Sequence, residues 1–382
     1  MNKQNLSEFK FKFDEEKVAN YMSSYLYQLS SYQGINPVRL FVFPSNKCND
    51  RCKYCAEHTK VSIKKDFFNN KDYIDKLVID IEDVGFKDIH LFGGGEPFFY
   101  KDNMFYFLEK MLAVDSFLRI ITNGANLTDM DIRNIVKSKF VSQLNITLNE
   151  DNESVADKLY FNKERHKNTV SVLESISKYK KMYKQRYPLV HIMFVLCNEN
   201  YNQIPKIASI LNDMDIEYFF IQPLRIDHED CLKLQLTNQQ KEEFLMMIPE
   251  VEKVFYDKHI RSNINNFKIN RDFIEDSRDH KSVVKNKLLF NKNSKIGCYY
   301  PLITFAIWAD GRMPKCFSMR DEFYKRNYFS LVSLKKFFKN KDFVDFTKQF
   351  IGEYCISNCK KCSICVLDEI EEIKKRMLNA GE

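Results

Sequence analysis

The chain has 382 residues, a formal net charge of +7 and eleven cysteines. This length accommodates a large core, and the odd number of cysteines argues against a disulfide framework. No run of about 18 apolar residues occurs, and the N-terminus lacks an apolar stretch of signal length, so we expect a cytoplasmic protein that does not span a membrane. Lysine and arginine are dispersed instead of forming a basic stripe, and we therefore expect no nucleic-acid partner.

The first part of the chain combines an expected helical segment with an unusual group of cysteines. Residues 1–35 are predicted to be helical, with Val18, Tyr21, Tyr25 and Leu29 on one face. A strand is predicted over residues 38–43, and Cys48, Cys52 and Cys55 follow it. Three thiolates this close can hold three corners of a [4Fe–4S] cluster, whereas a closed electron-transfer cluster has four cysteine ligands. One iron would then stay open to a small chelating molecule.

Further strands are predicted near residues 88–92, 117–121, 143–148, 189–196 and 216–222. Between them, apolar residues recur at helical spacing, and this strand–helix alternation indicates a parallel sheet. Two short motifs stand at predicted strand ends: Gly93-Gly94-Gly95-Glu96-Pro97 and Thr122-Asn123-Gly124. The carboxyl ends of parallel strands lie at one edge of a sheet, where active sites of α/β barrels form. We therefore expect both motifs to lie close to the cysteine loop.

The spacing of Cys48, Cys52 and Cys55, followed in order by the two strand-end motifs, resembles the radical S-adenosylmethionine (SAM) superfamily. The resemblance implies an α/β partial (β/α)6 TIM-like barrel, a [4Fe–4S] cluster that binds SAM, and cleavage of SAM to a 5′-deoxyadenosyl radical. Glu96 would accept hydrogen bonds from the SAM amino group. Zinc is the weaker alternative, because neither His58 nor a nearby cysteine completes a usual zinc spacing.

Other SAM contacts are carried over from the resemblance. Tyr54 would lie near the adenine and Thr147 near the ribose, although this chain has Asn149 where many relatives have aspartate. Arg165 would either pair with the SAM carboxylate or be a surface helix arginine. The expected cofactor-binding residues are Tyr54, Gly94, Gly95, Glu96, Asn123, Thr147, Arg165, Leu196 and Gln222. For Leu196 an ordinary core position is the stronger interpretation, and His90 and His191 are expected to be buried and satisfied by hydrogen bonds.

The C-terminal part carries a second group of cysteines. A helix is predicted from Thr237, where Thr237-Asn238-Gln239-Gln240 is typical of a capping box. Residues 303–308 are predicted to form a strand and Asp310-Gly311 a hairpin turn, which would bring Cys298 and Cys316 together. Four more cysteines follow: Cys355, Cys359, Cys362 and Cys365.

The spacing of Cys298, Gly311 and Cys316 resembles the SPASM and Twitch extensions of radical SAM enzymes, which bind auxiliary [4Fe–4S] clusters. A full SPASM module has seven cysteines and this chain has six here, so we expect one auxiliary cluster on Cys298, Cys316 and a CxxC pair. The pair is Cys359 and Cys362 or, alternatively, Cys362 and Cys365. A zinc knuckle formed by the last four cysteines of the chain is the competing interpretation. The isolated Cys197 and Cys231 are expected to be small buried hydrophobic residues.

These features predict three parts: residues 1–35, a radical SAM partial barrel over 36–225, and connecting helices with an auxiliary-cluster domain over 226–382. The expected function is that of a radical SAM oxidoreductase. Its substrate would be a small sugar-like or aminocyclitol metabolite or, alternatively, a ribosomally made peptide, and flavodoxin or ferredoxin would donate the electron. A non-catalytic iron–sulfur or zinc-binding protein is the hypothesis of another class.

Overall fold

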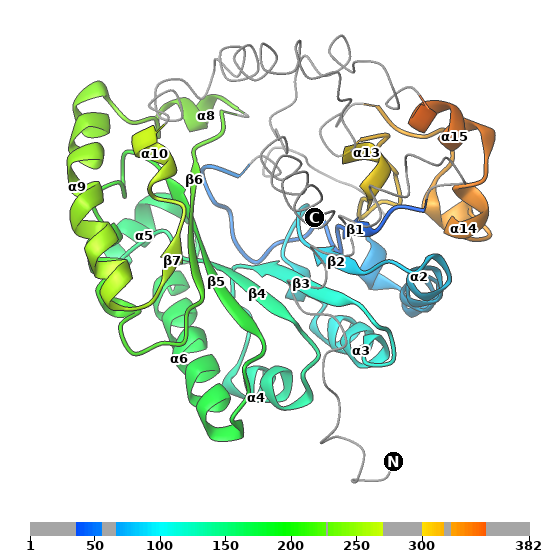
Figure 1. The fold of residues 1–382 in the computed structure, drawn as a ribbon, viewed down its shortest axis with the longest axis horizontal. Coiled ribbons are helices and arrows are strands. Elements are labelled where there is room, and N and C mark those ends of the chain that lie inside the picture. Colours follow the sequence, from blue (N-terminus) through cyan, green and yellow to red (C-terminus); the bar gives the residue numbers. More distant parts are fainter. Residues whose placement is uncertain (1–35, 56–65, 227, 270–299, 317–321, 349–382) are drawn as a thin grey trace, which may run out of the picture.

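A computed structural model describes residues 36–55, 66–226, 228–269, 300–316 and 322–348. Within these ranges, eight parallel strands form one sheet in the order β7-β6-β5-β4-β3-β2-β1-β8. The strands are β1 (Arg39–Val42), β2 (Asp88–Leu91), β3 (Phe117–Thr122), β4 (Gln143–Thr147), β5 (Leu189–Leu196), β6 (Tyr218–Pro223), β7 (Arg261–Ser262) and β8 (Thr304–Ile307). The sheet is open and curved, with its helices on the outer side (Figure 1). The predicted class, an α/β partial barrel, is therefore confirmed.

The helices follow the strands in alternation. Short 3-10 turns are η1 (Phe67–Asn69), η2 (Pro97–Tyr100) and η3 (Tyr328–Ser330). The helices along the sheet are α2 (Lys71–Val84), α3 (Lys101–Met111), α4 (Asp129–Ser138), α5 (Glu153–Leu159), α6 (Arg165–Tyr183), α7 (Ile204–Ile210), α8 (Glu229–Leu232) and α9 (Asn238–Asp257). The later ones are α10 (Asn266–Ile269), α13 (Tyr300–Ile303), α14 (Leu334–Phe337) and α15 (Lys341–Lys348). None of the helices in the described ranges is long and apolar enough to cross a membrane.

The main core lies between the outer face of the sheet and the helices. Alternate strand residues such as Leu40, Ile89 and Ile146 are fully buried there, because neighbouring side chains along a strand point to opposite faces. They pack against apolar helix residues, including Leu77 of α2 and Leu108 of α3. The six strands predicted from residues 38 to 222 all form, and the capping box at Thr237 begins α9 as expected.

The predicted strand at residues 303–308 forms as β8, but its partner differs from the expectation. β8 pairs in parallel with β1, with Arg39 opposite Thr304, and so extends the barrel sheet beyond the six expected strands. The expected turn at Asp310-Gly311 is present, since Trp308 N donates to Arg312 O at 2.9 Å. Cys298 lies outside the described residues, so its expected approach to Cys316 and the predicted domain limits stay predictions.

We predict that Phe305→Ala lowers the free energy of unfolding by about 3–5 kcal/mol, because Phe305 of β8 is 3% exposed within the main core. The control is Phe161→Ala, at a side chain that is 77% exposed, and it should change stability by no more than about 0.5 kcal/mol. Denaturant unfolding measures both. If Phe305→Ala changed the free energy of unfolding as little as Phe161→Ala does, β8 would not be packed on this sheet.

Candidate functional site

The cysteine loop follows β1 and is held by backbone hydrogen bonds to two other segments. Gly95 N donates to Ser45 O at 2.7 Å, Glu96 N donates to Lys47 O at 2.9 Å, and Lys53 N donates to Leu159 O at 3.0 Å. Cys48 is exposed, whereas Cys52 and Cys55 are partly buried. The loop is thus fixed between the β2–η2 turn and the end of α5.

Two glycines allow the β2–η2 turn to pack directly on the cysteine loop. A Cβ atom on Gly95 would lie 1.9 Å from Lys47 O, and one on Gly94 would lie 2.4 Å from Ser45 O. Gly94 also has a positive φ of 69°. Any side chain at these positions would push the loop that carries Cys48 out of place. The glycines of this motif therefore allow close approach of the cysteine loop itself.

Glu96 is 3% exposed and lies at the centre of the two strand-end motifs. Its carboxylate accepts hydrogen bonds from Phe98 N at 3.1 Å, from Asn123 N at 2.8 Å and from the Thr122 hydroxyl at 2.5 Å. Burial raises the pKa of Glu96, and these donors act in the opposite direction. An ionised carboxylate offers about four lone-pair sites, so roughly one remains for an ammonium group.

Asn123 connects the third motif to the cysteine loop. Its side-chain Nδ2 donates to Asn49 Oδ1 at 2.8 Å and lies 3.9 Å from Cys48 Sγ. The three motifs, which are spread over about eighty residues of sequence, therefore meet at one edge of the sheet. This juxtaposition was expected from the strand ends alone.

Arg165 is fully buried, so the alternative of a surface helix arginine is wrong. It is the first residue of α6, and its guanidinium donates to Thr147 O at 2.6 Å and to the Thr169 hydroxyl. Its Nε lies 3.5 Å from Asp50 Oδ2, inside the cysteine loop. Asp50 also accepts a hydrogen bond from Phe161 N at 3.3 Å. Asp50 was not singled out in the sequence analysis. Its position between Cys48 and Cys52 was the one sequence feature that could have drawn attention to it.

Tyr54 joins the cysteine loop to the end of β4. Its hydroxyl accepts a hydrogen bond from Asn149 Nδ2 at 2.6 Å, and Asn149 Oδ1 accepts one from Val195 N at 2.6 Å. An aspartate could not donate to Tyr54, which explains asparagine at this position. Tyr54 OH also lies 3.5 Å from Tyr160 OH, which donates to the buried Glu150 at 2.8 Å. Tyr160 and Glu150 were missed, because their contacts with the loop are not visible in sequence.

The remaining expected SAM contacts lie on neighbouring strands. Thr147 ends β4 and is partly buried, and Gln222 of β6 is opposite Val195 of β5. Leu196 is 3% exposed and belongs to the main core, which confirms the prediction of an ordinary core position. These residues occupy the same edge as the cysteine loop, while their contact with SAM stays a prediction.

The other cysteines divide into two groups. Cys316 is 8% exposed and follows β8, whereas Cys298, Cys355, Cys359, Cys362 and Cys365 lie outside the described residues. Cys197 and Cys231 are buried, as expected, and burial raises the pKa of Cys197 to about 12. Cys231 Sγ lies 3.3 Å from His228 Nε2.

His90 and His191 are partly buried rather than fully enclosed, which corrects the expectation in part. His90 Nε2 lies 2.9 Å from Asp88 Oδ1, and His191 Nδ1 lies 2.9 Å from Gln143 Nε2. Loss of water contact lowers the pKa of each histidine to about 4. Neither histidine belongs to the cysteine-loop site.

The set of residues at the cysteine loop fits an iron–sulfur cluster by its chemistry. Among the described residues, no three His, Cys, Asp or Glu side chains converge on one point that could hold a single metal ion. The cysteine ligands of a cubane bind different irons, however, and need not converge on one point. A buried carboxylate with remaining acceptor capacity lies beside the loop, as an aminoacyl group that chelates an open iron would require.

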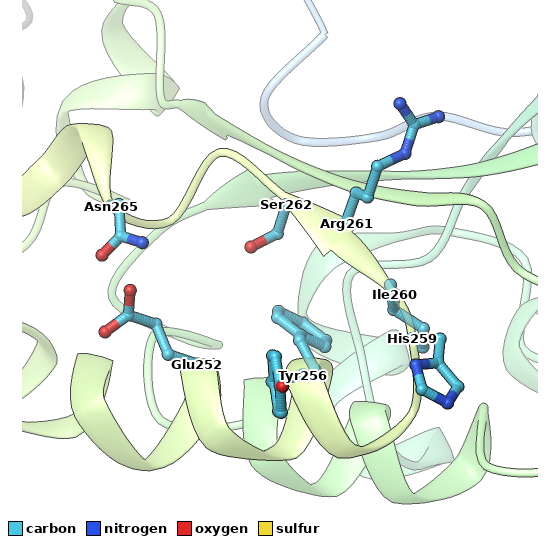
Figure 2. A pocket seen from close by; sticks show the side chains of 8 residues that line it. Glu252, Tyr256, His259, Ile260, Arg261, Ser262 and Asn265 are labelled. Atoms are coloured by element: carbon cyan, nitrogen blue, oxygen red, sulfur yellow. The ribbon is translucent and has the colours of Figure 1, made fainter.

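A separate cavity of about 480 Å³ lies between α9 and β7, at the edge of the sheet distant from β1. Its lining includes Glu252, Tyr256, His259, Ser262 and Asn265 (Figure 2). No motif in the sequence pointed to this cavity, and it shares no residue with the cysteine-loop site.

Comparison with known proteins defines the class of this fold and site. The profile of the Radical SAM superfamily matches residues 42–211, which include the cysteine loop, both strand-end motifs and β2 to β5. This segment of the chain is a radical SAM domain. No curated protein matches it.

Two solved structures resemble this chain in fold. Streptococcus suis SuiB bound to S-adenosylmethionine has a TM-score of 0.60 and 14% sequence identity, over 92% of this chain and 77% of SuiB. The protein anSMEcpe with bound AdoMet has a TM-score of 0.54 and 15% identity, over 86% of each chain. At these identities the similarity shows the fold alone.

We predict that Gly95→Ala removes most of the iron carried by the cysteine loop, about four atoms per chain, because its Cβ cannot fit beside Lys47 O. Iron analysis after anaerobic reconstitution measures this loss. The control is Gly85→Asn, at a helix end where a Cβ meets nothing within 4 Å and where asparagine tolerates the positive φ. Full iron in the Gly95→Ala protein would contradict the packing argument.

Stability should fall as the pH is lowered from about 6.5 to 4, because the unfolded chain protonates His90 and His191 at a higher pH than the folded protein does. The slope is at most about 1.4 kcal/mol per pH unit for each histidine. Urea unfolding at several pH values measures it. The double substitution His90→Gln and His191→Gln should flatten the slope, whereas His259→Asn, at an exposed histidine, should not. An unchanged slope in the double variant would contradict this account.

Proposed function

We propose that this protein is a radical SAM oxidoreductase that binds a [4Fe–4S] cluster through Cys48, Cys52 and Cys55. The proposal is supported most directly by the meeting of the cysteine loop, Glu96 and Asn123 at the carboxyl edge of the sheet. When bound and reduced, such a cluster supplies the electron that cleaves SAM to methionine and a 5′-deoxyadenosyl radical, which abstracts a hydrogen atom from the substrate.

The residues around the loop have complementary roles in this proposal. Glu96 accepts hydrogen bonds from the SAM amino group with its remaining acceptor capacity, and three protein donors fix its orientation. Arg165 holds the cysteine loop through Asp50 and holds the end of β4 through Thr147. The contact between Arg165 and the SAM carboxylate stays a prediction, as do the contacts of Tyr54, Thr147, Leu196 and Gln222 with the adenosine.

An auxiliary [4Fe–4S] cluster is the second part of the proposal. Its ligands would be Cys298, Cys316 and either Cys359 with Cys362 or Cys362 with Cys365. Cys316 supports this assignment by its position, since it follows β8 and β8 pairs with β1, the strand that leads into the first cysteine loop. A flavodoxin or a ferredoxin is the proposed electron donor.

Two substrate classes remain within the proposal. The first is a small sugar-like or aminocyclitol metabolite that is oxidised or epimerised. The second is a ribosomally made peptide, and it is favoured by similar folds that have been solved with peptides: SuiB with precursor peptide SuiA, and anSMEcpe with the Kp18Cys peptide.

Anaerobic reconstitution tests the proposal. We expect about eight irons per chain and release of 5′-deoxyadenosine from SAM under dithionite. The Cys52→Ala protein should keep about four irons and release no 5′-deoxyadenosine, because only the first cluster would be lost. The matched control, Cys197→Ala, replaces a buried cysteine outside the loop. It should keep about eight irons per chain and still release 5′-deoxyadenosine.

Three outcomes would count against the proposal. Continued SAM cleavage by the Cys52→Ala protein would remove the first cluster assignment. Detection of about four irons per chain together with bound zinc would mean that the auxiliary site holds zinc and not a [4Fe–4S] cluster. A wild-type protein with intact clusters that releases no 5′-deoxyadenosine, with or without added candidate substrates, would remove the enzymatic proposal.

A further inference from the structure

Asp50 is the only acidic residue of the cysteine loop, and it stands two residues from Cys48 and two from Cys52. Two residues of chain span at most about 7 Å, so Asp50 lies close to two of the expected cluster ligands. Its side chain is fully buried, whereas the basic residues Arg51 and Lys53 of the same loop are exposed. The loop therefore contains one carboxylate that water does not contact.

The carboxylate of Asp50 is held in one orientation by the backbone around it. Its Oδ1 accepts hydrogen bonds from Arg51 N at 2.7 Å, from Phe161 N at 3.3 Å and from Asn162 N at 3.4 Å. Its Oδ2 accepts no hydrogen bond in the described part of the chain and lies 3.5 Å from Arg165 Nε. This second oxygen is therefore paired with a charge instead of a hydrogen-bond donor.

Arg165 supplies the positive charge of this pair from a different element. It is the first residue of α6, and its side chain is fully buried. It donates to Thr147 O at 2.6 Å, and its guanidinium lies 5.1 Å from the centre of the Tyr160 ring. Two opposite charges therefore lie next to each other at the cysteine loop, each fixed by its own element and each shielded from water.

Buried charges at this place would act on the reduction of a cluster, because reduction adds one electron to it. A buried negative charge nearby opposes the added electron and lowers the reduction potential, whereas a buried positive charge favours it. The effect is larger than that of surface charges, since water and salt screen charges at the surface. Asp50 and Arg165 have opposite signs, so each should shift the potential in its own direction.

We propose that Asp50 and Arg165 set the reduction potential of the cluster on the cysteine loop, Asp50 by lowering it and Arg165 by raising it. This inference rests on the proposed function, because it requires a cluster on Cys48, Cys52 and Cys55. One electron passes from the donor to the cluster, and neither residue is oxidised or reduced. The balance between the two charges decides how strong a reductant the donor must be and how strongly the reduced cluster drives the electron into SAM.

Redox titration of the anaerobically reconstituted full chain, followed by electron paramagnetic resonance in the absence of SAM, tests the proposal. The loop cluster is identified by the signal that the Cys52→Ala protein lacks. At a fixed applied potential, we expect Asp50→Asn to raise the ratio of reduced to oxidised loop cluster by about tenfold, which corresponds to about 59 mV for a one-electron couple. Arg165→Gln should lower this ratio by a similar factor.

Further variants separate a charge effect from a structural one. Asparagine keeps the shape of Asp50 and one acceptor oxygen, and the double variant with Arg165→Gln, which removes both charges, should return the ratio to within about threefold of the wild type. Asp157→Asn, at an exposed aspartate of α5, should leave the ratio unchanged, because water screens this charge. If Arg165→Gln does not keep its iron, Asn49→Asp, which adds a negative charge to the same loop, takes its place with the same expected direction.

The proposal would be overturned if the single variants keep the ratio of the wild type, or if both shift it in the same direction, as a loosened loop would. Release of 5′-deoxyadenosine under dithionite is measured on the same preparations. SAM cleavage by a protein whose potential does not respond to the two charges would reject this inference and leave the proposed function intact. Opposite shifts in the variants without SAM cleavage by the wild type would reject the proposed function instead. A wild type without the loop signal would reject both.

Discussion

The contact between the backbone of Gly94–Gly95 and the backbone of Ser45–Lys47 is the constraint on which the site depends. A Cβ atom on Gly95 would lie 1.9 Å from Lys47 O, so the contact exists only without a side chain. It places the cysteine loop of β1 beside the turn that follows β2, and the Glu96 backbone continues the contact by donating to Lys47 O. Glu96 thereby lies next to the loop, with its carboxylate oriented by the backbone of Asn123.

The opposite side of the loop is fixed by buried polar groups. Arg165 and Asp50 form a buried ion pair, and removing one partner of such a pair commonly costs about 3–5 kcal/mol, because the other charge is left without compensation. Tyr54 and Asn149 add a hydrogen bond between the loop and the end of β4. The loop is therefore held on both sides by protein contacts alone. An organised loop lowers the entropic cost of binding a cluster, since fewer dihedral angles must be ordered.

Local sequence signals predicted the fold and the centre of the site, and distant contacts were missed. The strands from 38 to 222 were predictable because each combines an apolar run with a helical segment after it, and strand ends located Glu96 and Asn123. β8 was assigned to a C-terminal hairpin, since nothing in four residues specifies a partner strand more than 260 residues earlier. Asp50 was overlooked, because its partner Arg165 is 115 positions away (165 − 50). The contacts of Asp88 with Arg39 and Arg119 were also missed, because they depend on which strands are neighbours in the sheet.

The most direct test of the central claim is electron paramagnetic resonance of the dithionite-reduced, reconstituted protein before and after addition of SAM. The account predicts that SAM changes the signal of the cluster bound to Cys48, Cys52 and Cys55, because one iron of that cluster has no protein ligand. The change should be absent in the Cys52→Ala protein. A reduced cluster signal that is identical with and without SAM would contradict the account, since the iron would then be closed and Glu96 would have no aminoacyl group to bind.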